Sequence, residues 1–227
     1  MYYRRFDAPP PDPALVRDLT RQQEEMKSQV IIQKPEFNLK LIAGCDSSFI
    51  GEDTILSVFV LLTYPALELV EKVWHHGPVT LPYIPGLLSF REAPNLLKTY
   101  ELLQQKPDLI MVDGHGISHP RRLGIATHLG LHLQKPTMGV AKKVLVGQYT
   151  EPAPEKGALS PLTYKGEVIA NVLRTKDKVK PVFVSPGHLL DLHTATSVAL
   201  SCTLKHKLPE PTRLADHFAA VLKPEVR

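Results

Sequence analysis

The sequence predicts a mixed α/β fold in which an antiparallel three-strand meander is followed by alternating strands and helices, with helices flanking the sheet. Two patterns predict this fold class. Three stretches rich in strand-forming residues are separated by short turns, at 39–45, 55–62 and 67–74. Further on, the apolar run 109–112 precedes apolar residues at helical spacing over 123–133. A short apolar run of this kind indicates a strand that is buried on both faces.

The chain begins with a Pro-rich segment, about 1–13, which we expect to be loose. A surface helix is expected over 14–31, where Leu15 and Leu19 lie on one helical face with charged residues around them. We interpret this helix as a packing element. Because no internal repeat or linker interrupts the pattern, 1–227 is expected to form a single domain.

Turn residues between the early stretches predict how they connect. Gly51 and its polar neighbours separate the first two, and the dipeptide Tyr64-Pro65 separates the second from the third. Short connections join antiparallel neighbours, so a meander is the natural topology. Asp46 lies near the centre or the end of the first strand.

The next segment, 75–92, is a loop dense in Pro and Gly that holds Tyr83 between two prolines. A helix is expected from about Pro94 to about 105, because Pro is favoured in the first turn of a helix. This assignment places Glu92 at the N-terminal end of the helix.

The strand expected at 109–112 ends on Asp113 and leads into a loop that contains Gly, His, Gly, His and the pair Arg121 and Arg122. Open α/β sheets bind ligands at the carboxyl ends of their strands. The loop therefore suits a cation and a phosphate. A short strand at 137–141 is expected after the next helix.

Three other interpretations of this loop are weaker. Asp-Gly is a hairpin signal, but the residues after Gly114 do not form a second alternating strand. The loop lacks the Gly-Lys-Ser/Thr ending of a Walker A motif. His115 and His119 could share a helical face as zinc ligands, yet Pro120 disfavours helix at His119.

Beyond Lys143 the expected elements are a Pro-rich loop, two strands and two helices. The loop is expected at 151–159, the strands at 168–173 and 182–184, and the first helix at 190–204. The last helix contains Asp216.

The composition narrows the class of protein. Of the 227 residues 43% are hydrophobic, which is enough for a full core. No stretch approaches the roughly 18 apolar residues of a membrane span, and the first residues carry no apolar export signal. Because Cys45 and Cys202 lie far apart in apolar surroundings, they fit buried thiols of a reducing compartment, and a cytoplasmic location is expected. The net charge of +4 permits a polyanionic partner, and basic residues gather at 121–122, 142–143 and 176–180.

Three carboxylates form a candidate site: Asp46 on the first strand, Glu92 at a helix start and Asp113 at a strand tip. If the first strand neighbours the fourth, Asp46 and Asp113 lie side by side. Converging carboxylates without a Cys partner suit a hard cation such as Mg²⁺, which also binds phosphate oxygens.

Four long runs then occur in an order typical of one family. They are LPYIPGLLSFRE (81–92), PDLIMVDGHGISHPRRLGIATHLG (107–130), PTMGVAKK (136–143) and LPEPTR (208–213). Over roughly 35–217 the chain resembles endonuclease V, the deoxyinosine-directed repair nuclease. The resemblance implies a fold similar to ribonuclease H. It also implies Mg²⁺-dependent hydrolysis, with Mn²⁺ expected to substitute, of the second phosphodiester bond 3′ to a deaminated purine.

Carried over position by position, the resemblance implies catalytic roles for particular residues. Asp46, Glu92 and Asp113 match the family's catalytic carboxylates and are the implied metal ligands. Lys142 matches its active-site lysine, and Asp216 falls on its fourth active-site position.

Other residues are expected to bind the substrate. Tyr83 matches the family's strand-separating wedge, and glycines allow the backbone to approach an extruded base closely. The expected set is Tyr83, Arg91, Gly114, Gly116, His119 and Gly139.

The expected partner is DNA that contains deoxyinosine or other deaminated bases, bound by a monomer away from membranes. An alternative keeps the site but makes inosine-containing RNA the main substrate, because contacts to the 2′-hydroxyl are not visible in a sequence. A binding module would keep the groove and lack one of the carboxylates, all of which are present. A small-molecule phosphohydrolase would need neither a wedge nor basic clusters beside the site.

Overall fold

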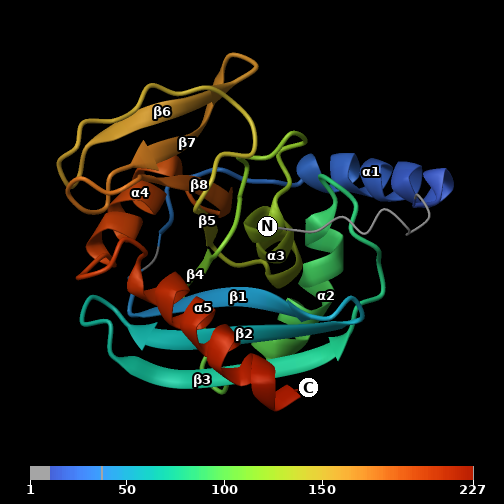
Figure 1. Cartoon of the computed structure of the whole chain (residues 1–227). Coiled ribbons are helices and arrows are strands. Elements are labelled where there is room, and N and C mark those ends of the chain that lie inside the picture. Colours follow the sequence, from blue (N-terminus) through green and yellow to red (C-terminus); the bar gives the residue numbers. More distant parts are fainter. Residues whose placement is uncertain (1–10, 37, 227) are drawn as a thin grey trace.

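Eight strands form one mixed sheet with helices on both faces, in the computed structural model of residues 11–36 and 38–226 (Figure 1). The helices are α1 (Pro13–Lys27), α2 (Leu88–Glu101), α3 (Ile125–Leu133), α4 (Leu192–Ser201) and α5 (Glu210–Leu222), and a 3-10 helix, η1 (Lys223–Val226), follows α5. The strands are β1 (Leu41–Ile50), β2 (Thr54–Thr63), β3 (Leu69–Pro78), β4 (Leu109–Val112), β5 (Thr137–Ala141), β6 (Leu159–Tyr164), β7 (Glu167–Leu173) and β8 (Val182–His188).

The order of strands across the sheet is β3-β2-β1-β4-β5-β8-β7-β6. β1, β2 and β3 are antiparallel neighbours, whereas β4 runs parallel to β1 and β5 runs parallel to β4. β8, β7 and β6 extend the sheet with antiparallel pairs. The expected meander is confirmed, and so is the expected place of the fourth strand beside the first.

β2 is buried on both faces, which explains its nearly continuous apolar sequence. Phe59 and Leu61 pack with α2 on one face. Val58 and Val60 pack with α5 on the other. The meander therefore lies between two helices.

Helices α2 and α3 cover one face of the sheet, and α4 and α5 cover the opposite face. In β1, Ala43 and Cys45 belong to the first face and Ile42 to the second. Gly44 lies on the second face, where an added Cβ would be 2.0 Å from the backbone oxygen of Pro211 in α5. The lack of a side chain at Gly44 lets α5 lie directly on β1.

Two helix boundaries differ from those expected. α1 ends at Lys27 and not at residue 31, because Ser28 caps it and donates its hydroxyl to a carbonyl of the last turn. α2 begins at Leu88 and not near Pro94, so Glu92 lies inside the helix. An internal proline deletes one backbone hydrogen bond, and the long apolar face of α2 compensates for this loss.

The strands and the fourth helix also differ in extent. β1 runs beyond residue 45, so Asp46 lies within the strand. β6 occupies 159–164, whereas the sequence predicted a loop up to residue 159 and no element directly after it. β6 is an edge strand, and an edge strand tolerates a proline such as Pro161. α4 spans less than the expected 190–204, because Asp191 accepts a hydrogen bond from the N–H of Thr194 and caps it.

The expected loose leader falls mostly on residues 1–10, which lie outside the described residues. Pro13, at its expected end, belongs to α1. That 1–227 forms a single domain stays a prediction.

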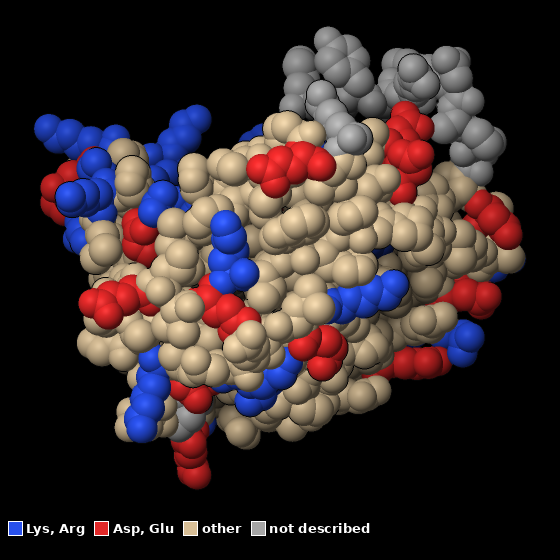
Figure 2. All heavy atoms as spheres, turned by 90° about the horizontal axis from the view of Figure 1, so that it is seen from below, with Lys and Arg blue, Asp and Glu red and all other residues tan. Residues whose placement is uncertain are grey.

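Charged side chains of both signs are interspersed on the face in Figure 2, and Lys and Arg gather toward the side where Figure 1 shows β7 and α4. Among the described residues, no helix is long and apolar enough to cross a membrane.

Candidate active site

Asp46 and Asp113 lie side by side because β1 and β4 pair in parallel. Cys45 is opposite Val112 in this pairing, and the backbone N–H of Asp113 donates to the carbonyl oxygen of Cys45 at 3.0 Å. Both carboxylates therefore reach the same edge of the sheet, as the sequence predicted.

Asp216 reaches the same edge from α5. Asp46, Asp113 and Asp216, which we call the acid cluster, each offer one carboxylate oxygen, and these oxygens lie within 4.8 Å of one another. The close contact of Gly44 with α5 brings this helix near enough to β1 for Asp216 to join the two strand residues.

Lys142 is the residue after β5, the strand next to β4. Its Nζ lies 2.6 Å from Oδ2 of Asp113 and 3.4 Å from Oδ1 of Asp216. Burial acts to lower the pKa of the Lys142 ammonium, but the two carboxylates outweigh burial and raise the pKa above its usual value. Lys142 therefore stays a cation at neutral pH.

The carboxyl groups resist ionisation in this arrangement. Burial, followed by the charge of Asp113, raises the pKa of Asp46 to about 7. Burial, with Asp46 and Asp113 next, raises the pKa of Glu92 to about 8. The pKa of Asp113 is also raised by burial, although Lys142 opposes the rise. Half-buried carboxylates that repel each other in this way fit a divalent cation, which would offset their charge.

The close group differs from the expected set of metal ligands. Asp46 and Asp113 belong to it as expected, but the third member is Asp216, where the sequence indicated Glu92. Glu92 lines the adjoining cavity together with Asp113 and lies close enough for the charges of Asp46 and Asp113 to raise its pKa, and its role as a metal ligand stays a prediction.

A cavity of about 210 Å³, which we call the Tyr83 cavity, adjoins the acid cluster. Its wall includes Tyr83 from the loop 79–87, Glu92 from α2, and residues from the loop after β4. Among them are His115 and His119, and burial lowers the pKa of each to about 4. Both imidazoles are therefore neutral at pH 7. The cavity thus joins an apolar and uncharged wall to the carboxylates.

The family model of endonuclease V matches residues 24–217. The chain belongs to the endonuclease V family.

Individual relatives agree with the family match. Endonuclease V of Trichormus variabilis is 48% identical over 215 residues, which cover 93% of this chain and 97% of the relative. The crystal structure of endonuclease V from Streptomyces avermitilis superposes with a TM-score of 0.89 at 36% identity, over 96% of this chain and 95% of that one. Endonuclease V of Ciona intestinalis, solved with a 24mer DNA containing an inosine followed by a ribo-adenosine, gives a TM-score of 0.84 at 28% identity, over 94% and 100% of the two chains.

The family assignment confirms two expectations. The fold is ribonuclease H-like, and the chain is a nuclease that hydrolyses phosphodiester bonds.

Several residues expected to bind substrate in this endonuclease V-family chain also make contacts within the protein. The guanidinium of Arg91 lies 4.3 Å from the centre of the Phe49 ring and donates to the carbonyl oxygen of Glu52 at 3.2 Å. At Gly139 an added Cβ would be 2.4 Å from the backbone oxygen of Gly114, so the glycines let the loop after β4 pack on β5. Their contact with substrate stays a prediction.

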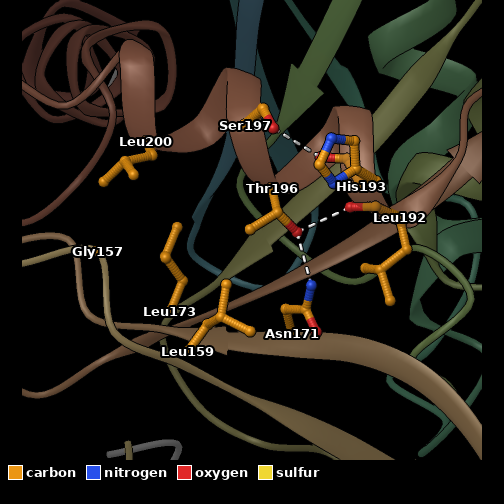
Figure 3. Close-up of a pocket in the computed structure, with 9 residues that line it drawn as sticks. All are labelled: Gly157, Leu159, Asn171, Leu173, Leu192, His193, Thr196, Ser197 and Leu200. Atoms are coloured by element: carbon orange, nitrogen blue, oxygen red, sulfur yellow. Dashed lines mark hydrogen bonds between the residues drawn. The ribbon is translucent and has the colours of Figure 1, made fainter. Parts of the chain in front are cut away.

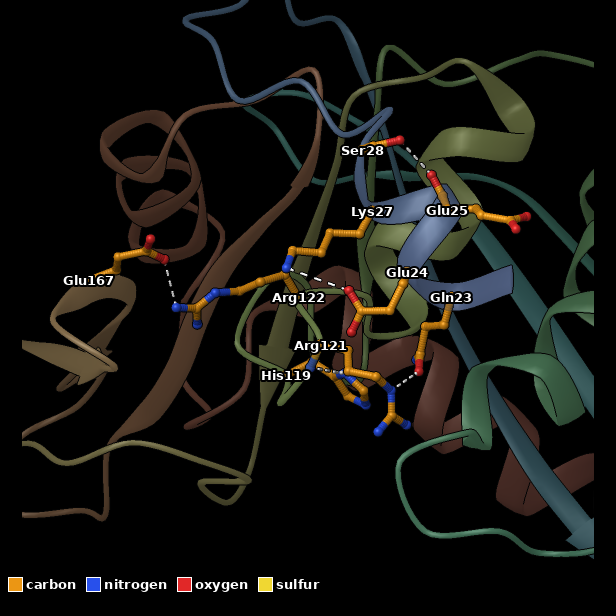
Figure 4. Close-up of polar contacts among 9 residues, drawn as sticks. All are labelled: Gln23, Glu24, Glu25, Lys27, Ser28, His119, Arg121, Arg122 and Glu167. Atoms are coloured by element: carbon orange, nitrogen blue, oxygen red, sulfur yellow. Dashed lines mark hydrogen bonds and ion pairs between the residues drawn. The ribbon is translucent and has the colours of Figure 1, made fainter. Parts of the chain in front are cut away.

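The two arginines of the expected phosphate site are engaged elsewhere. Arg122 pairs with Glu167 at 2.7 Å and donates to the carbonyl oxygen of Tyr164 at 3.1 Å (Figure 4). Arg121 binds Gln23 of α1 and the carbonyl oxygen of Gly86. Both side chains hold loops together.

Sequence reasoning missed Ser185 and Gln23. The hydroxyl of Ser185, in β8, accepts from the N–H of Gly116 at 2.8 Å and from the hydroxyl of Ser118 at 2.9 Å, and so it shapes the loop after β4. No local pattern marks this serine. Gln23 lies four residues after Leu19, on the apolar face of α1, and a polar residue at this position was the available signal.

A larger cavity of about 470 Å³ lies between α4 and the strands β6 and β7 (Figure 3). Four leucines dominate its wall, and its polar groups include Asn171, whose amide donates to the hydroxyl of Thr196 at 2.9 Å. None of the acid cluster is among the residues that line it. The smaller cavity is therefore the better candidate for chemistry.

Proposed function

We propose that the protein is a DNA repair endonuclease that recognises deaminated purines, above all deoxyinosine, and hydrolyses the second phosphodiester bond 3′ to the lesion. Mg²⁺ is the proposed cofactor, and Mn²⁺ substitutes for it. One observation carries the proposal: Asp113 belongs both to the acid cluster and to the wall of the Tyr83 cavity. A base held in this cavity would have its flanking backbone beside the carboxylates.

The acid cluster supports metal-assisted hydrolysis. A divalent cation supplies Lewis-acid polarisation of a phosphate oxygen and makes an attacking water more acidic. Asp46, Asp113 and Asp216 are the residues that would hold it, with Glu92 close by. The proposal needs no covalent enzyme intermediate.

Lys142 contributes a fixed positive charge next to two of these carboxylates. Negative charge increases on the phosphate oxygens when water attacks phosphorus, and a cation that is already in place stabilises this charge. We assign this role to Lys142.

Tyr83 supports recognition of a base in duplex DNA. The residue is 56% exposed although it lines a cavity, between the prolines Pro82 and Pro85. A ring in this position can enter the duplex where a base leaves the stack, and the extruded base can enter the cavity. A lesion that pairs weakly costs less to extrude, which favours deaminated bases.

DNA is favoured over RNA as the substrate because the related enzyme of Ciona intestinalis was solved with inosine-containing DNA. A cytoplasmic location is proposed from the two buried free cysteines, Cys45 and Cys202. The monomer is proposed as the active form.

The test compares cleavage of end-labelled duplexes that carry one inosine, in DNA and in RNA, with identical duplexes that lack it. We expect cleavage of the inosine DNA at the second bond 3′ to the lesion with Mg²⁺ or Mn²⁺, weak activity with Zn²⁺, and none in EDTA. Cleavage in EDTA would remove the proposed metal, equal cleavage of undamaged DNA would remove the proposed specificity, and faster cleavage of RNA would replace the proposed substrate.

A further inference from the structure

α1 carries a buried amide on a helix whose charged residues face solvent. Arg21 pairs with Glu25 at 3.1 Å, and both side chains are exposed. Gln23, by contrast, is 0% exposed. A leucine would suffice for packing at such a position, whereas a buried amide needs hydrogen-bond partners.

The amide of Gln23 binds two loops that are distant from it in sequence, and Figure 4 shows its contact with Arg121 of the loop after β4. Its Nε2 donates to the carbonyl oxygen of Leu123 at 2.9 Å and to that of Gly86 at 3.2 Å. Its Oε1 accepts a hydrogen bond from Nε of Arg121, and Nη2 of Arg121 donates to the same Gly86 oxygen at 2.8 Å. The amide thus joins the loop 79–87, which we call the Tyr83 loop, to the loop after β4.

Gly86 is suited to this contact by its backbone. Its φ is +78°, and an added Cβ would be 2.8 Å from Nη2 of Arg121. Glycine adopts this conformation at no steric cost. The carbonyl of Gly86 can therefore face both Gln23 and Arg121.

Apolar contacts with α1 hold the Tyr83 loop as well. Leu19 forms a buried cluster with Ile84 and Leu87, and Leu81 packs against the cluster. Leu81 and Ile84 lie on either side of Tyr83 in the sequence. The exposed ring therefore projects from a segment that α1 fixes on both sides.

We propose that Gln23 is a positioning residue that holds the Tyr83 loop and the wall of the Tyr83 cavity in the geometry needed to recognise an extruded base. Both carbonyl acceptors of Gln23, those of Gly86 and Leu123, belong to residues that line the cavity. Gln23 itself is not among the lining residues. It acts through the residues it binds, as the supporting shell of a binding site does.

The physical reason is that a wedge must be held firmly to work. Insertion of the Tyr83 ring into a stacked duplex costs free energy, because base stacking has to be broken. If the loop is flexible, it moves away instead, and the base stays in the stack. This role rests on the proposed function, because it requires that Tyr83 acts on paired DNA.

The experiment uses the full chain with Gln23→Ala and Gln23→Glu, and Gln22→Ala as the matched control, because Gln22 is the exposed neighbour on the same helix. Gln23→Glu keeps an acceptor for Arg121 and loses the amide donors, so it provides a folded variant if Gln23→Ala is unstable. Two quantities are measured: amide hydrogen exchange of residues 81–90, and kcat/KM on inosine in paired DNA and in an unpaired bubble.

We expect faster exchange in 81–90 for both Gln23 variants, with the sheet unchanged, and a loss of about tenfold on paired DNA that exceeds the loss on the bubble, as removal of one or two buried hydrogen bonds would give. Gln22→Ala should match the parent protein. Unchanged exchange would overturn the hydrogen-bonded anchor, whatever the substrate. Faster exchange with equal losses on the two substrates would overturn the positioning role. If Tyr83→Ala also fails to separate paired from bubble DNA, the proposed function of Tyr83 fails with it, while the exchange result still decides whether Gln23 anchors the loop.

Discussion

The acid cluster and the Tyr83 loop adjoin one cavity, but the fold holds them in different ways. Asp46 is within a strand and Asp113 directly follows one, while Asp216 lies on a helix pressed against the sheet. The Tyr83 loop is held by side chains of α1, through an apolar cluster and the amide of Gln23. The carboxylates of the acid cluster are thus fixed by the backbone of the core, whereas the Tyr83 loop is fixed by an outer helix. Changes in the acid cluster should therefore affect every substrate, and changes in the Tyr83 loop should affect paired substrates most.

The largest effect is expected from Asp113→Asn. Loss of this charge removes one anionic ligand and the 2.6 Å partner of Lys142, so cleavage of paired and bubble inosine DNA should fall together by at least about 10³-fold. Binding of DNA should persist, because lysines and arginines supply much of the affinity for phosphates. Cleavage rates, with a binding assay and a melting curve, measure both claims. Asp18→Asn, at an exposed site on α1, is the control, and normal cleavage by Asp113→Asn would move the catalytic centre elsewhere.

Lys142→Ala should give the next largest effect. Removal of a charge at the phosphate should slow cleavage by roughly 10²-fold, by a similar factor on paired and bubble substrates. Lys143→Ala is the matched control, since it removes the same charge from an exposed neighbour. Single-turnover rates measure the effect. A loss confined to paired DNA would assign Lys142 to recognition and remove the contrast between the two regions.

Tyr83→Ala should have a smaller and more selective effect. Unstacking a base costs on the order of a few kcal/mol, and without the ring this cost is not offset, so cleavage of paired inosine DNA should fall by about tenfold or more. Cleavage of the bubble, which needs less unstacking, should fall less, and Tyr83→Phe should stay close to the parent protein. The ratio of the two rates is the measurement. Equal losses on both substrates would make Tyr83 a packing residue.

The smallest effect is expected in the stability of the metal-free protein as a function of pH. The raised pKa values of Asp46 and Glu92, about 7 and about 8, mean that the folded state binds more protons than the unfolded state, so stability falls as pH rises from about 4, where the unfolded carboxyls ionise, and levels off only above about 8. Between about pH 6.5 and about pH 8 the fall should be on the order of 1 kcal/mol. Chemical denaturation at several pH values measures it.

The decline of stability with pH can be distinguished from the effects of other titrating groups. The pKa of His128 is lowered to about 3, first by burial, so this group costs stability only as pH falls below about 6.5, where the unfolded histidine becomes protonated. Added Mg²⁺ should suppress the decline above pH 6.5, because it binds the ionised carboxylates of the folded state. Glu92→Gln should reduce the slope. A decline that persists unchanged in Glu92→Gln would contradict the assignment.

The parts of the site that could be predicted from the sequence are those fixed by local pattern and parallel strand pairing. Asp113 follows an apolar run that forms β4, and β1 lies beside β4 and runs parallel to it. Asp46 and Asp113 are therefore close because the two strands are neighbours in the sheet. The proximity of Asp216 could not be predicted in this way. It depends on the fit of α5 over Gly44, a contact between distant parts of the chain.

Other features were hidden for physical reasons as well. β6 contains Pro161 and lies at the edge of the sheet, so its pattern lacks the usual strand signal. α2 starts before its proline because its apolar face outweighs one lost hydrogen bond. Gln23 looks like one more polar residue of a surface helix until the loops that it binds are in place.

The packing of α5 against Gly44 also has a consequence for folding during synthesis of the chain. A ribosome delivers the chain from its N-terminus, so β1, β4 and β5 can pair while α5 is still to be synthesised. A nascent chain at that stage has Asp46 and Asp113 but lacks Asp216. The acid cluster is complete only after α5 has emerged and docked, so an unfinished chain has two of its three carboxylates.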